Sequence, residues 1–175
     1  MASFDNSFEA RAFRSGAEPL LSPEIIESQL KALLPSELRQ LYDSFSAAIV
    51  FDQNIVFPAP GCRFANEEGL ISIELILGPT DGDSGILQAN NRLKGQIPDD
   101  TIAFAELAGG NMLLFERHDG GVFVWLHDEP LPSRATSLVA NSLGEFFSSL
   151  SVADDTWSGS LADLGLDLEA MGLKK

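Results

Sequence analysis

The sequence predicts a single α+β domain in which a central antiparallel sheet, with a meander at about residues 101–127, is covered by helices. Three short apolar runs in this region are joined by glycine-rich turns, the pattern of consecutive antiparallel strands. Apolar residues at helical spacing lie on both sides of it. The length of 175 residues fits one domain.

The chain divides into three parts. Residues 1–21 show no sustained periodicity and contain Gly16 and Pro19, so we expect a poorly ordered N-terminal segment. Residues 22–151 carry the predicted α+β domain. Residues 152–175 form an acidic C-terminal extension, in which glycines interrupt a weak apolar pattern.

Two helices are predicted at the start of the domain. Ser22, Pro23 and Glu24 form a helix start, with a hydroxyl cap, a proline that needs no N–H, and an acid at the positive end of the helix dipole. Pro35 ends this helix and begins a second one. The residues expected on the buried faces are Ile26, Leu30, Leu33 and Leu34 in the first helix, and Leu38, Leu41, Tyr42 and Phe45 in the second.

The next segments are less regular. Residues 47–57 are rich in β-branched and aromatic side chains, which predicts short strands or an extended loop. Alternation over 71–77 predicts a strand, although a helix remains possible there because 75–77 is apolar throughout. An acidic turn at 79–85 leads to a short helix at 86–94.

In the meander, both alternating sets of positions are apolar, so these strands should be central and covered on both faces, with Trp125 in the core. Pro130 and Pro132 then break the sheet. We expect a final helix from Ser137 to Leu150 that packs over the sheet. Its buried side should carry Leu138, Val139, Leu143, Phe146, Phe147 and Leu150.

Composition narrows the function classes. The formal net charge of −15 opposes binding to nucleic acid and to anionic membranes. No apolar run approaches the ~20 residues of a membrane span, and the N-terminus lacks the apolar core of a signal peptide. Cys62 is the one cysteine, which fits a reducing compartment. We therefore expect a cytoplasmic protein.

Few residues suggest chemistry. His118 and His127 are each followed by an acid, but they should lie at opposite ends of one strand and cannot share a metal. Neither a nucleophile motif nor a phosphate-binding glycine motif is present. Asp81, Asp83, Asp99 and Asp100 lie in loops but lack the spacing of a calcium loop. We expect no catalytic residue, no cofactor and no metal.

Four ordered motifs lie between Ile25 and Leu150: Leu34-Pro35 before Glu37-Leu38-Arg39, Ile102-Ala103-Phe104 before Gly109-Gly110-Asn111, Gly121-Val122-Phe123-Val124-Trp125 before His127-Asp128, and Glu145-Phe146-Phe147. Together they resemble the SUKH superfamily, the SMI1/KNR4-like proteins, which include a yeast cell-wall regulator and bacterial toxin-immunity proteins. The chain departs from the family pattern at Phe45-Ser46-Ala47-Ala48, where members often carry an Asn-Gly-Gly turn.

The resemblance implies a non-enzymatic protein-binding domain, in many bacterial members an immunity protein that neutralises a polymorphic toxin, often a nuclease. Because a nuclease surface is basic, an acidic antagonist suits it, and we expect a basic protein partner. The acidic loop residues are the expected contacts: Asp81, Asp83, Asp99, Asp100 and Asp119. A regulatory scaffold of the same fold and an unrecognised enzyme or metal-binding protein remain alternatives, and the sequence predicts no oligomeric state.

Overall fold

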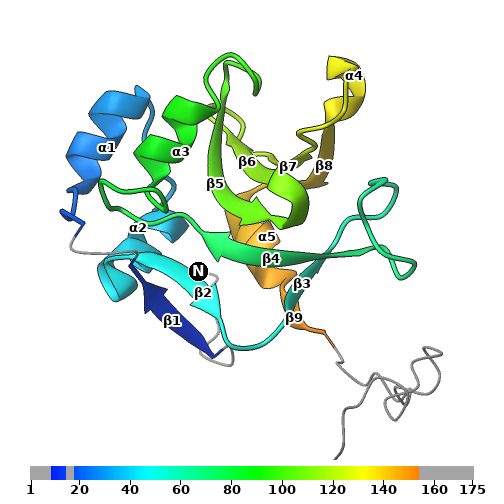
Figure 1. Cartoon of the computed structure of the whole chain (residues 1–175), viewed down its shortest axis with the longest axis horizontal. Helices are drawn as coiled ribbons and strands as arrows, with labels where there is room; N and C mark the ends of the chain where they lie inside the picture. The colour runs from blue at the N-terminus through cyan, green and yellow to red at the C-terminus, as the bar shows by residue number, and fades with distance from the viewer. Residues whose placement is uncertain (1–8, 15–17, 154–175) are drawn as a thin grey trace, which may run out of the picture.

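The computed structural model describes residues 9–14 and 18–153 (Figure 1). The strands within them are β1 (Ala10–Phe13), β2 (Ala48–Phe51), β3 (Ile55–Pro58), β4 (Leu70–Ile76), β5 (Thr101–Leu107), β6 (Met112–Glu116), β7 (Val122–Trp125), β8 (Thr136–Ala140) and β9 (Ser151–Val152). The helices are α1 (Pro23–Leu30), α2 (Ser36–Phe45), α3 (Ile86–Arg92), α4 (Pro132–Ala135) and α5 (Leu143–Ser148), with a 3-10 turn at Ala108–Gly110. The α+β class is confirmed.

The strands form one antiparallel sheet in the order β1-β2-β4-β5-β6-β7-β8. Strand β3 lies off this path and pairs with β4 and β9. Consecutive pairing of β5, β6 and β7 confirms the predicted meander. Its strands occupy the middle of the sheet, and β5 and β6 are buried on both faces, as the two-sided apolar pattern indicates.

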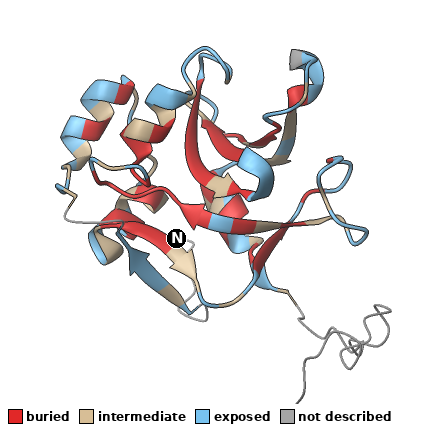
Figure 2. Cartoon of the chain, in the orientation of Figure 1, coloured by how far each residue is buried: buried red, intermediate tan, exposed pale blue. Residues whose placement is uncertain are grey.

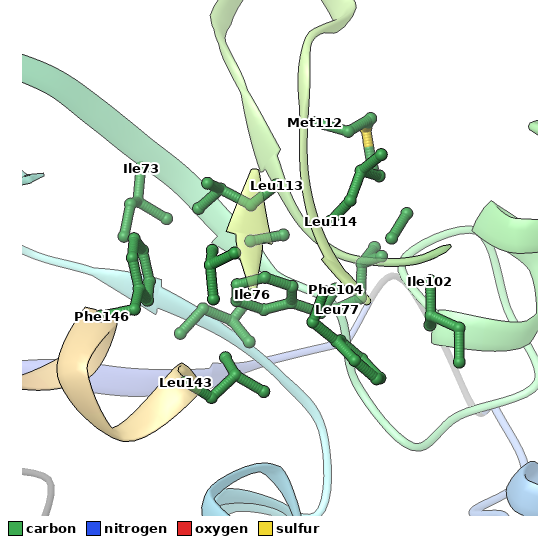
Figure 3. Close-up of a cluster of buried hydrophobic side chains, with 14 of the residues drawn as sticks. Ile73, Ile76, Leu77, Ile102, Phe104, Met112, Leu113, Leu114, Leu143 and Phe146 are labelled. Carbon is green, nitrogen blue, oxygen red and sulfur yellow. The ribbon is translucent and has the colours of Figure 1, made fainter. Parts of the chain in front are cut away.

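The core consists of the sheet and the buried faces of α1, α2, α3 and α5, and its aromatic part lies between the sheet and α5. Phe146 packs edge-on against Phe104 of β5, with ring centroids 5.8 Å apart, and against Phe57 of β3 at 5.1 Å. Figure 3 shows Leu143 and Phe146 directed at this cluster, and Figure 2 shows that buried positions follow the central strands. Trp125 is buried, as predicted.

The first two helices begin where the sequence predicts. The Ser22 hydroxyl accepts a hydrogen bond from the Ile25 N–H, and α2 follows Pro35. The prediction that Leu33 lies on a buried face is wrong, because Leu33 is 79% exposed. Helix α1 ends at Leu30, because Lys31 takes a left-handed conformation with φ 54°, and Leu33 therefore lies in the loop before α2.

The open alternatives between 47 and 94 are resolved. Residues 70–76 form a strand, not a helix, and the 47–57 region forms β2 and β3 around a turn. The acidic loop after β4 leads into α3, whose Leu87 is buried.

The predicted helix from Ser137 to Leu150 is wrong in its first half. Residues 136–140 form β8 along the open side of β7, and the helix begins only after Ser142, whose hydroxyl accepts from the Glu145 N–H. The β-branched Thr136 and Val139 favour an extended backbone. Leu138, expected on the buried face of a helix, is 56% exposed.

The N-terminal segment also differs from the expectation. Residues 10–13 form β1 and pair with β2, and the Arg11 guanidinium contacts the Asp52 carboxylate at 2.6 Å. This strand was missed because four residues with one charge carry too little periodicity to predict it. The extension from 152 begins within β9, and its residues from 154 onward lie outside the described part. In that described part, no helix combines the length and the apolar character that spanning a bilayer requires.

Candidate partner-binding surface

Asp81 and Asp83 lie exposed in the loop between β4 and α3. The loop closes on itself through the Gly78 N–H, which donates to Ser84 O at 2.9 Å. One Asp81 carboxylate oxygen accepts from the Gln88 amide at 3.1 Å, and the Asp83 carbonyl accepts from Arg92 at 3.1 Å. Both aspartates therefore sit on a loop tied to the helix that follows it.

Asp99, Asp100 and Asp119 meet at another place. Thr101 pairs with Glu116 at the start of β5, and the Arg117 N–H donates to Asp100 O at 2.9 Å. This register brings the segment before β5 beside the turn between β6 and β7, so the three exposed aspartates share one end of the meander. The predicted acidic residues thus form two groups, one before α3 and one after it.

A groove of about 630 Å³ lies beside this turn, against the end of α1. Its lining residues are Glu27, Ser28, Lys31, Ala32, Leu33, Arg117 and His118. One Arg117 amino group donates to Leu30 O at 2.7 Å, so the arginine caps the end of α1 and fixes one wall. The groove presents positive charge and an exposed leucine on an otherwise acidic chain.

Sequence reasoning missed this groove. The walls of the groove come from segments that are far apart in the sequence: Arg117 and Leu30, which are hydrogen-bonded to each other, are separated by 87 positions. The one local signal is the break in the helical pattern after Leu30, where Lys31 precedes an alanine and two leucines. Ending the predicted helix at Leu30 would have led to the prediction that Leu33 is exposed.

The two histidines are separated, as the sequence predicts. His118 lies in the turn before β7, whereas His127 follows the end of β7, where its N–H donates to the Asn111 side chain at 3.1 Å. Among residues 9–14 and 18–153, no three His, Cys, Asp or Glu side chains come together in a way that could hold a metal ion.

One carboxyl lies in a different setting. Glu106 of β5 lines a pocket of about 260 Å³ together with Glu74 and Arg92. Burial raises the pKa of Glu106, the Arg92 charge opposes that shift, and the Glu74 charge adds to it. The Arg92 guanidinium stands 3.6 Å from the Glu106 carboxylate. Glu106 therefore shares this pocket with a second carboxyl and an arginine, and no Ser, Cys, Lys or His side chain of the described residues lines the pocket.

The other shifted carboxyls belong to helix starts. Hydrogen bonds from the backbone lower the pKa of Glu24 in α1 and of Glu145 in α5. Burial raises the pKa of the Tyr42 hydroxyl, which lies in the core. These shifts follow from helix capping and packing, and none marks a reaction centre.

Comparison with known proteins gives one family. The model described as "SMI1 / KNR4 family (SUKH-1)" matches residues 23–149, well over half of the chain. The match begins at the first residue of α1 and ends at the C-cap of α5, so it includes the whole meander and both acidic groups. None of the curated proteins compared with the chain matches it.

Proposed function

This chain belongs to the SMI1/KNR4 family (SUKH-1), and from that premise we propose that it is a non-enzymatic protein-binding domain acting as an immunity protein that neutralises a positively charged toxin. Family membership fits an immunity-like or a regulatory protein-binding domain. The observation that favours the immunity role is the net charge of −15, which attracts a basic toxin such as a nuclease.

The proposed contact surface is the acidic group at the start of the meander. Asp99, Asp100 and Asp119 are exposed and lie on loops held by the β5–β6 pairing. Loops on a rigid sheet can present charge to a partner without a large ordering cost. Asp81 and Asp83 form a second acidic group that serves as the internal comparison.

The first experiment is affinity capture from the host at low and at high salt. The expected partner is one basic protein whose association weakens steeply as salt rises, because screening removes long-range attraction between unlike charges. Recovery of a neutral or acidic partner whose binding ignores salt would contradict the proposal. Several host partners, with no toxin gene adjacent to this gene, would favour a regulatory scaffold.

The second experiment compares the two acidic groups with the recovered partner. We expect the triple variant Asp99→Asn, Asp100→Asn and Asp119→Asn to slow association by roughly tenfold at low salt. The double variant Asp81→Asn and Asp83→Asn is the control; it removes two charges instead of three and should change the rate by less than about twofold. Equal effects would show that net charge alone, and not this surface, steers the partner.

A third experiment addresses the enzyme alternative. Because His118 and His127 lie at opposite ends of β7, their joint replacement by alanine should leave toxin neutralisation unchanged. Loss of neutralisation in a variant that still folds and still binds the partner would favour chemistry at one of them.

A further inference from the structure

Strand β8 is an edge of the sheet and pairs only with β7 among the described residues. The opposite edge, β1, is short and carries Arg11, which contacts Asp52. Charged side chains on an edge strand discourage pairing with another chain. Strand β8 reads Thr-Ser-Leu-Val-Ala and has no charge and no proline, so it lacks this protection.

The backbone of β8 has free groups that face away from β7. The Leu126 N–H donates to Ala135 O at 2.8 Å, which makes 126 and 135 a hydrogen-bonded pair. Such pairs alternate along an antiparallel ladder, and the register pairs Trp125 with Thr136 and Phe123 with Leu138. Thr136 and Leu138 therefore direct their N–H and C=O groups to the open edge.

Leu138 gives this edge an accessible apolar side chain. Leu138 is 56% exposed and lies opposite the half-buried Phe123 of β7. In a strand added beside β8, alternate side chains would contact this pair while the backbone groups bond to Thr136 and Leu138. The edge of β8 thus offers both backbone hydrogen-bonding groups and an apolar side-chain contact to an added strand.

Acidic residues flank both ends of β8. Val122 pairs with Ala140, so the turn that contains Asp119 lies at one end, together with Glu145 of α5. At the other end, Asp128 follows β7, and its side chain is 72% exposed despite the contact with Arg63. A strand seated on β8 would meet Asp119 and Glu145 at one end, and at the other end Asp128 together with the exposed Arg134 of α4.

We propose that β8 is the docking edge for an extended segment of the basic protein partner, which adds to the sheet as a further strand with its positive residues beside Asp119 and Asp128. The proposal rests on the function proposed above and extends the contact surface from Asp119 along the edge of β8. A second copy of this chain is a poor occupant, because two molecules of charge −15 repel each other.

The test uses a defined probe, a short peptide in which valine and threonine alternate between lysine pairs at both ends. In nuclear magnetic resonance titrations, the peptide should shift the backbone amides of 136 and 138 and slow their hydrogen exchange. A peptide with glutamate pairs in place of the lysines should bind at least about tenfold more weakly. Shifts confined to another surface, or equal binding of both peptides, would overturn the proposal.

Two matched variants then separate the edge from general surface effects. Leu138→Lys places a positive charge on the edge and should weaken peptide binding about tenfold or more. Leu20→Lys is the control, because Leu20 is equally accessible at 55% exposed. It pairs with Thr80, which follows β4, and strands β5, β6 and β7 separate β4 from β8 in the sheet. This control variant should change binding by less than about twofold. Circular dichroism checks that both variants fold.

The remaining outcomes distinguish the two proposals. If a basic partner is captured from the host and binds Leu138→Lys as tightly as the unaltered chain, the docking edge is wrong while the protein-binding function stands. If no basic partner is captured, the proposed function fails, and the peptide titration still decides whether β8 accepts a strand. A dimer that Leu138→Lys dissociates would make a second copy the occupant and contradict the proposal.

Discussion

Strands β5 and β8 belong to the same sheet but lie in opposite environments. Every residue of β5 except Glu106 is buried, and the strand pairs with neighbours on both sides. In β8 only Ala140 is buried, and the strand has one neighbour. The sequence predicts β5 correctly and mistakes β8 for part of a helix.

The difference shows what a sequence pattern can report. A strand buried on both faces must be apolar at consecutive positions, and its short length between glycine turns separates it from a helix. An edge strand is mostly exposed, so burial does not restrict its residues. Strand β8 and helix α5 follow each other almost directly along the chain. The apolar residues Leu138 and Val139 of the strand happen to continue the helical spacing of the apolar residues in α5, so the sequence predicts one helix.

The largest expected effect comes from removing the aromatic centre of β5. Phe104 is fully buried against Phe115, Phe146 and Phe147. Phe104→Ala should lower the free energy of unfolding by about 3–5 kcal/mol, measured by urea denaturation. Phe13→Ala, on the partly exposed edge strand β1, should cost less than about 1 kcal/mol. Similar costs would mean that the centre and the edge do not differ in packing.

Hydrogen bonding distinguishes the centre in a second way. The Asn90 side chain of α3 donates to Ala103 O at 2.8 Å and accepts from the Ala103 N–H at 2.9 Å, where the β5–β6 register shifts. Asn90→Ala leaves these groups unpaired, so we expect a loss of about 1–3 kcal/mol in unfolding free energy. Asn91→Ala, at the exposed neighbouring position, should change it by less than about 0.5 kcal/mol.

The contact between Asn90 and Ala103 also shows the limit of sequence reasoning. Helix α3, the meander and the capped start of α1 follow from local spacing and from capping residues such as Ser22. The roles of Asn90 and Arg117 depend on partners 13 and 87 positions away, which no local pattern reports. For the same reason the acidic loops could be named as surface features, whereas their division into two groups required the register of β5 and β6.

A cap variant tests whether β8 and α5 are separate elements. Ser142 is the N-cap of α5, so Ser142→Ala should lower the free energy of unfolding by about 0.5–2 kcal/mol. If residues 137–150 formed one helix, Ser142 would be internal, and alanine would stabilise it. Ser148→Ala, near the end of α5, is the control and should be neutral or slightly stabilising. The sign of the Ser142 effect therefore decides between the two structures.

A smaller effect is expected on β8 itself. Leu138→Thr keeps a strand-forming residue at an exposed position, and the free energy of unfolding should change by less than about 0.5 kcal/mol. Thermal denaturation of the two proteins measures this. A loss of about 2 kcal/mol or more would indicate that Leu138 is buried, as a continuous helix over the sheet would require.

The smallest effect comes from Glu106, the one position where β5 is not buried. Burial raises its pKa above the ordinary value of 4.5, so the folded state holds its proton more tightly than the unfolded state. The stability that this bound proton contributes is fully present below pH 4.5 and is lost as the pH rises through the pKa of the folded state. Glu106→Gln should therefore gain stability relative to the unaltered chain as pH rises, in urea denaturation from about pH 4 to about pH 7.

Glu145, in the first turn of α5, has a pKa shifted in the opposite direction from that of Glu106. Hydrogen bonds from Asn141 lower its pKa, so its contribution is complete above the ordinary value of 4.5 and is lost as pH falls through the folded pKa. Glu145→Gln should thus lose stability relative to the unaltered chain as pH rises over the lower part of the same range. Parallel slopes for the two variants would contradict the assignment, because burial on β5 and hydrogen bonding at the start of α5 shift a carboxyl pKa in opposite directions.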